Sequence, residues 1–152
     1  MAARRILDVI FDILTLLALA IAGVGHFLPW FTIRGDTLDA GLSPIDFQMW
    51  HAAHSGTALG VAALLVGASL VFEFGSRGRK LLVLLMFASV LVSIGFQVMI
   101  YTPYPITEAH RQFAECDWSE LDGFLVAFVP SIIAGVLCLA RMGWTMTAPP
   151  NA

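Results

Sequence analysis

The sequence predicts an all-α integral membrane protein, built as a bundle of four transmembrane helices. Apolar residues make up 59% of its 152 residues and charged residues 12%, and the mean hydropathy is +0.84. A soluble domain carries about 25% charged residues. A domain of roughly 150 residues still leaves about 30% of its unfolded surface exposed, so it has no room to hide this apolar excess from water.

Charged residues bound the first two spans. No charged side chain falls between Asp12 and Arg34, and the first helix is expected over Leu7–Phe31. The next uncharged run ends at Glu73, and the second helix is expected over Trp50–Phe74. A helix rises 1.5 Å per residue, so roughly 20 residues cross a bilayer core of about 30 Å. Both runs reach that length.

The third and fourth spans follow the same rule. Pro103 ends the third helical run, which is expected over Lys80–Tyr101. The fourth run lies between Asp122 and Arg141, is the shortest, and predicts a helix over Leu121–Met142. Barrel strands would alternate in segments of about 10 residues, whereas these runs are continuously apolar. Helices also satisfy their own backbone hydrogen bonds in lipid.

Basic residues predict the orientation. Only Arg34 and Arg111 fall on one side of the predicted bundle, and the other basic residues fall on the opposite side: Arg4, Arg5, Arg77, Arg79, Lys80 and Arg141. The positive-inside rule then places both termini in the cytoplasm. We therefore expect a multi-pass protein of the plasma or inner membrane, with an acidic outer face. Residues 1–144 are expected to form one domain, and residues 145–152 a disordered tail.

The second outer loop is expected to contain a short amphipathic helix, from about Glu108 to Glu120. Thr107 would cap its first turn. Its apolar side would rest on the mouth of the bundle, with charged residues facing water.

Small residues predict where helices approach closely. The second span contains Gly56-x-x-x-Gly60, and the fourth carries Ala127, Ser131 and Gly135 at four-residue steps. In lipid, helix association depends on such close packing because the hydrophobic effect no longer drives it. Both stripes are expected to be packing surfaces.

Two further features of the spans have more than one interpretation. Ser89, Ser93 and Gln97 form a polar stripe in the third span; it would form hydrogen bonds between helices, or, less favoured, line a polar path. Pro130 leaves a carbonyl of the fourth span without its donor, so a kink is expected there. A static kink is favoured over a gating hinge.

No Asp, Glu, Lys or Arg lies near the middle of a predicted span. Such residues usually mark ion-coupled transport, voltage sensing or proton transfer, so the pattern argues against those functions and leaves a passive oligomeric pore open. Asp8 and Asp12 are expected at the cytoplasmic interface, near Arg4 and Arg5.

All four histidines map to the outer half of the bundle, and they are the candidate ligands for a metal or haem. Imidazole binds Zn and Cu and can hold a haem iron, so haem b or a Cu or Zn ion at the outer face is the cofactor considered. The favoured alternative is hydrogen bonding to carbonyls, water or headgroups, and a pH-sensing role is a third. The candidate residues are His26, His51, His54, His110 and Cys116.

These observations predict a small tetraspan protein. They favour a non-enzymatic accessory or structural subunit over an enzyme. Its expected partners are the lipid bilayer and other membrane-protein subunits. The net charge of −3 gives no basic footprint for nucleic acid. The alternatives are a metal- or haem-binding redox protein that uses the outer histidines, and a passive pore.

Overall fold

The computed structural model describes residues 2–28, 31–33, 40–42, 50–101, 116–117 and 122–147. Its four helices are α1 (Ala2–Gly25), α2 (Trp50–Val71), α3 (Ser76–Tyr101) and α4 (Asp122–Met146). Each contains a stretch that is long and apolar enough to cross a membrane. The predicted four-helix, multi-pass architecture is therefore confirmed at this level.

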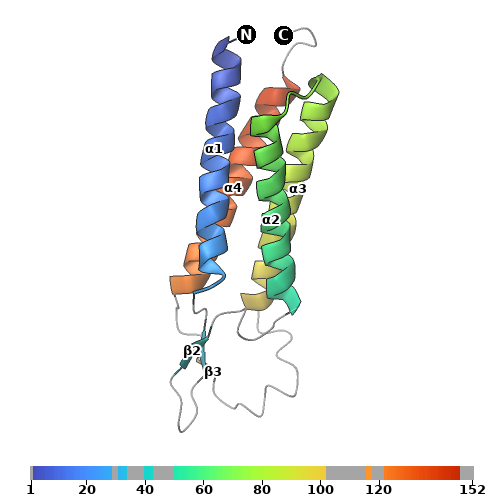
Figure 1. The fold of residues 1–152 in the computed structure, drawn as a ribbon. Helices are drawn as coiled ribbons and strands as arrows, with labels where there is room; N and C mark the ends of the chain where they lie inside the picture. The colour runs from blue at the N-terminus through green and yellow to red at the C-terminus, as the bar shows by residue number, and fades with distance from the viewer. Residues whose placement is uncertain are drawn as a thin grey trace.

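The helices form a four-sided bundle in which each contacts two neighbours. Helix α1 contacts α2 and α4, and α3 contacts the same two helices. The start of α1 and the end of α4 lie at one end of the bundle (Figure 1), which we call the terminal end. The link Phe72–Gly75 also lies at this end, since it joins α2 directly to α3.

Three short strands lie at the opposite end, which we call the strand end (Figure 1). They are β1 (Phe31–Ile33), β2 (Ala40–Leu42) and β3 (Cys116–Asp117), arranged in the antiparallel order β2-β1-β3. The segment Glu108–Glu120 was predicted to be helical. Its described residues, Cys116 and Asp117, instead form a strand that pairs with β1. This pairing supplies hydrogen-bond partners for their backbone N–H and C=O groups. The rest of that segment lies outside the described residues.

Helix boundaries differ from the predicted ones at several ends. Helix α1 ends at Gly25 and closes with a tight turn, in which the N–H groups of His26, Phe27 and Leu28 each donate to the carbonyl three residues earlier. Leu28 precedes Pro29 in the sequence, and a residue before proline disfavours helical backbone. Helix α4 continues to Met146, past the predicted domain limit at residue 144.

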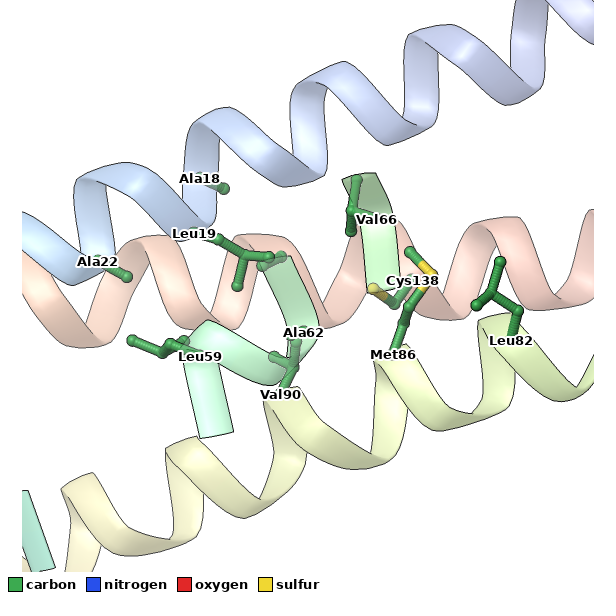
Figure 2. Close-up of a cluster of buried hydrophobic side chains, with 11 residues drawn as sticks. Ala18, Leu19, Ala22, Leu59, Ala62, Val66, Leu82, Met86, Val90 and Cys138 are labelled. Atoms are coloured by element: carbon green, nitrogen blue, oxygen red, sulfur yellow. The ribbon is translucent and has the colours of Figure 1, made fainter. Parts of the chain in front are cut away.

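Small and medium apolar side chains fill the middle of the bundle (Figure 2). This core draws on all four helices and consists of Ala18, Leu19, Ala22, Leu59, Ala62, Val66, Leu82, Met86, Val90, Ala134 and Cys138. Large apolar side chains cover the outside, as Leu64 (76% exposed) and Val136 (60% exposed) illustrate. This arrangement suits a bundle surrounded by lipid, where apolar groups are stable on the outer surface.

Candidate functional site

A chain of hydrogen bonds crosses the bundle between the apolar core and the strand end. It joins His26, in the turn after α1, to one or two residues from each of the other helices, and we call it the polar chain: His26, Ser55, Ser93, Gln97 and Ser131. All five side chains are buried. The contacts run from His26 Nε2 to Ser55 Oγ (2.9 Å), to Ser93 Oγ (2.9 Å), to Gln97 Nε2 (3.1 Å) and to Ser131 Oγ (2.9 Å).

The ends of the polar chain determine which groups donate when His26 is neutral. The His26 Nδ1 atom lies 2.9 Å from the carbonyl of Ala22, which can only accept, so Nδ1 carries the proton. Nε2 then accepts from the hydroxyl of Ser55. At the other end the amide nitrogen of Gln97 can only donate, so Ser93 accepts from Gln97 and donates to Ser55. Between Gln97 and His26 the donors therefore point from α3 through α2 toward the turn after α1.

Gln97 is the branch point of the polar chain. Its amide nitrogen also donates to Ser131, whose hydroxyl donates onward to the carbonyl of Ala127 at 2.8 Å. The amide oxygen of Gln97 is buried without a hydrogen-bond partner in the described part of the protein. A buried acceptor without a partner costs about 1–3 kcal/mol, which limits the net stability gained at this residue.

A second polar cluster lies on the other side of the apolar core, toward the terminal end. We call it the Asp12 cluster: Asp12, Ser69 and Arg141. The Arg141 guanidinium pairs with the Asp12 carboxylate, and both side chains are only 2% exposed. Arg141 also donates to Ser69 at 2.7 Å, and Ser69 donates to Asp12 at 2.8 Å. Three helices are thus connected by charge and hydrogen bonding.

The Asp12 cluster lies beside a cavity of about 660 Å³. Two more ion pairs stand near its outer rim: Arg79 with Asp8 at 3.6 Å, and Arg5 with Glu73 at 3.0 Å. Arg5, Asp8 and Asp12 line this cavity together, while the side chain of Arg4 lies outside the described residues, so the expected grouping of both carboxylates with Arg4 and Arg5 stays a prediction. Each carboxylate also pairs with an arginine from another helix: Asp8 with Arg79 of α3, and Asp12 with Arg141 of α4.

The candidate histidine site is only partly within the described structure. His26 uses both ring nitrogens in the polar chain, and His54 stacks at a tilt against Phe96 with ring centroids 5.4 Å apart. The side chains of His51 and Cys116, and the whole of His110, lie outside the described residues. Among the described residues no three His, Cys, Asp or Glu side chains gather as metal ligands. The metal or haem site stays a prediction.

The two small-residue stripes have different surroundings. Ala127, Ser131 and Gly135 of α4 are buried. A Cβ added at Gly135 would meet Val90 and Ile94 at 3.6 and 3.7 Å. By contrast, Gly56 and Gly60 of α2 are exposed, and a Cβ added at either would meet no described residue within 4 Å.

The polar stripe and the proline also have defined places. Ser93 and Gln97 point into the bundle and belong to the polar chain, whereas Ser89 is half-buried. Pro130 lies inside α4, which remains a helix on both sides of it. A polar path along Ser89, Ser93 and Gln97 stays a prediction. A kink or a hinge at Pro130 also stays a prediction.

Sequence reasoning missed three features: the Asp12 cluster, the role of Ser55, and the nearest approach of α1 and α4. A Cβ added at Gly25 would lie 2.6 Å from the Cα of Ala127 and 2.7 Å from the carbonyl carbon of Val126. Gly25 comes two residues after Gly23 and three after Ala22 in α1, but its spacing from them forms no G-x-x-x-G motif. For the Asp12 cluster a signal was present, since Asp12 and Arg141 lie within helical segments and carry opposite charges.

Comparisons with protein-family models, with curated proteins and with solved structures find no match to this chain.

Proposed function

We propose that this chain is a non-enzymatic tetraspan subunit that packs against partner membrane proteins. The observation that carries the proposal is the contrast between the two small-residue stripes. The α4 stripe is covered by the chain's own helices, while Gly56 and Gly60 leave a shallow open face on α2. Small residues in a membrane helix allow a second helix to approach its backbone closely, and none of the four described helices covers this face.

The interior polar groups support the same proposal. Members of the polar chain and of the Asp12 cluster bond to one another across helices. Buried polar contacts of this kind hold a bundle in one arrangement. These residues thus serve the stability of the scaffold, and Ser93 and Gln97 face the interior of a single chain rather than a pore between copies.

Photo-crosslinking in native membranes tests the proposal. A photoreactive amino acid replaces Leu64, which is 76% exposed and lies one turn beyond Gly60 on α2. We expect a discrete crosslinked protein band. The double variant Gly56→Leu/Gly60→Leu should remove that band, because two large side chains block close approach. It should leave folding intact, because nothing in the described part of the chain occupies that space.

Gly95→Leu is the matched control. Gly95 is an exposed glycine of α3 that also has nothing within 4 Å of an added Cβ. The crosslinked band should survive in this variant. A band that persists in the Gly56→Leu/Gly60→Leu variant, or crosslinking to lipid alone, would contradict the proposal.

We also propose that the terminal end faces the cytoplasm and that the protein resides in the plasma or inner membrane. The described basic residues outside the Asp12 cluster gather at this end, in α1 and at the start of α3: Arg5, Arg77, Arg79 and Lys80. Such enrichment is typical of the cytoplasmic side.

A further inference from the structure

The cavity beside the Asp12 cluster is large for a membrane protein of this size. It has a volume of about 660 Å³, which is within the range of small-molecule sites. Its walls come from α1, the last residues of α2, the link Phe72–Gly75, and single arginines of α3 and α4. It therefore lies at the terminal end, where the helices leave the apolar layer.

The charges that line the cavity balance. Three arginines and three carboxylates contribute, namely Arg5, Arg79, Arg141, Asp8, Asp12 and Glu73. A site for a simple anion or cation would show an excess of one sign. Equal numbers of both signs favour a ligand that carries one positive and one negative group.

Two buried atoms of the lining residues lack hydrogen-bond partners among the described residues. One is Nε of Arg141, a cationic donor, and the other is Oδ1 of Asp8, an anionic acceptor. Each such atom is costly to leave unsatisfied. A ligand with an anionic oxygen and an N–H group would supply the acceptor and the donor that the two atoms require.

The remaining wall of the cavity is apolar and reaches the outer surface of the bundle. Val71 and Phe72 line it and are 74% and 62% exposed, and Leu70 is 37% exposed. In a membrane these side chains would contact acyl chains directly. The cavity thus has a charged interior and an apolar rim that faces lipid. A phospholipid has the same two parts, a charged headgroup and apolar acyl chains.

We propose that this cavity binds the headgroup of an aminophospholipid. The phosphate diester accepts a hydrogen bond from Nε of Arg141 and faces Arg79 and Arg5 at the rim, and the primary ammonium donates to Oδ1 of Asp8. The acyl chains leave along Val71 and Phe72. The assignment concerns a ligand of one chain and does not depend on whether α2 packs against a partner protein.

Native mass spectrometry of the full chain in mild detergent tests the proposal. The purified protein is incubated with phosphatidylethanolamine, phosphatidylcholine or phosphatidylglycerol of matched acyl chains. We expect phosphatidylethanolamine to bind about tenfold more tightly than the other two, a ratio that corresponds to one charge-assisted hydrogen bond. Phosphatidylcholine is the informative comparison because its quaternary ammonium has no N–H to donate.

Two variants test the contacts with the ammonium group and with the phosphate separately. Asp8→Asn should reduce the affinity for phosphatidylethanolamine to that for phosphatidylcholine. Arg5→Gln should weaken both lipids alike, and its 75% exposed side chain makes a folding defect unexpected. Arg77→Gln is the control, since Arg77 is exposed at the same end and does not line the cavity.

Four results would overturn the proposal: equal binding of phosphatidylethanolamine and phosphatidylcholine, tighter binding of phosphatidylglycerol, a preference unchanged in Asp8→Asn, or loss of the preference in Arg77→Gln. Soluble glycerophosphoethanolamine provides the last arm of the test. We expect it to compete only weakly. Competition as strong as that of the lipid would assign the cavity to a free zwitterion and would refute the lipid assignment.

Discussion

Arg141 near the end of α4 pairs with Asp12 of α1, although 129 residues separate them in the sequence. Both side chains are 2% exposed and lie within the apolar stretches of their helices. Removing two charges from water costs several kcal/mol per ion, which only close contact and further hydrogen bonds offset. Ser69 supplies such bonds to both partners. The pair thus fixes α1 against α4 with help from α2.

Breaking this pair from one side should strongly destabilise the bundle. Arg141→Met leaves the Asp12 carboxylate buried without its counter-charge. We expect the free energy of unfolding to fall by about 3–5 kcal/mol. Denaturant titration of the protein in detergent micelles, followed by circular dichroism, measures this loss.

The double variant Asp12→Leu/Arg141→Met should lose much less than the single one, because no unpaired charge remains. Arg77→Met serves as the control and should change the free energy of unfolding by no more than about 0.5 kcal/mol, since Arg77 is exposed. A double variant that loses the sum of both single effects would show that the two residues act independently.

Gly25 should tolerate no larger side chain. A Cβ there would collide with the α4 backbone at Ala127, whose Cα would lie 2.6 Å away. Gly25→Ala is expected to cost about 1–3 kcal/mol by overpacking. The same titration measures this effect, and purified yield gives an independent check.

Gly23→Ala provides the comparison two residues earlier. It lies in the same helix with nothing within 4 Å of an added Cβ, and alanine favours a helix over glycine by about 1 kcal/mol. We expect it to be neutral or stabilising. Equal losses in the two variants would mean that α1 and α4 do not meet closely at Gly25.

The polar chain should contribute unevenly to stability. Ser55→Ala removes the bond to His26 and the bond to Ser93, so we expect a loss of about 0.6–1.7 kcal/mol, the range for hydrogen bonds between membrane helices. Gln97→Met preserves volume and also removes a buried acceptor that has no partner among the described residues, so it should cost less. Unfolding titrations that rank the two in the opposite order would refute this account.

Composition and the spacing of charges were sufficient to predict the four helices. The lengths of the apolar runs follow from bilayer thickness, so the number and approximate position of the spans could be read directly. The ends were less accurate, as at Gly25, because a helix end depends on local turns and on proline rather than on hydropathy. The pairing of Cys116–Asp117 with β1 is a contact between distant segments, which a local helix pattern cannot reveal.

The candidate site was harder to predict for the same reason. Asp12 and Arg141 each mark the end of an uncharged run, which is consistent with an interfacial position when each helix is considered alone. Asp12 and Arg141 face the interior only because of how α1 and α4 are rotated about their axes. Contacts between the two helices, such as Gly25 against Ala127, determine that rotation. Ser55 had no sequence signal, since a single serine in an apolar helix is unremarkable until a histidine faces it.

The final prediction follows from the proposed orientation of the bundle in the membrane. In a Cys138→Ala background, the native Cys116 of β3 should react with a membrane-impermeant maleimide in intact cells. With Cys116 also replaced by Ser, Arg77→Cys introduces a thiol at an exposed position of the terminal end. This thiol should react only after the membrane is permeabilised, because arginine-rich helix ends face the cytoplasm.

The two labelling reactions control for one another, since β3, which contains Cys116, and the start of α3, which contains Arg77, lie at opposite ends of the bundle (Figure 1). The reverse pattern would keep the four-helix fold and invert its orientation. Labelling of both sites in intact cells would be a more serious result. It would place the strand end and the terminal end in one aqueous compartment, which a chain whose helices each cross the bilayer cannot allow.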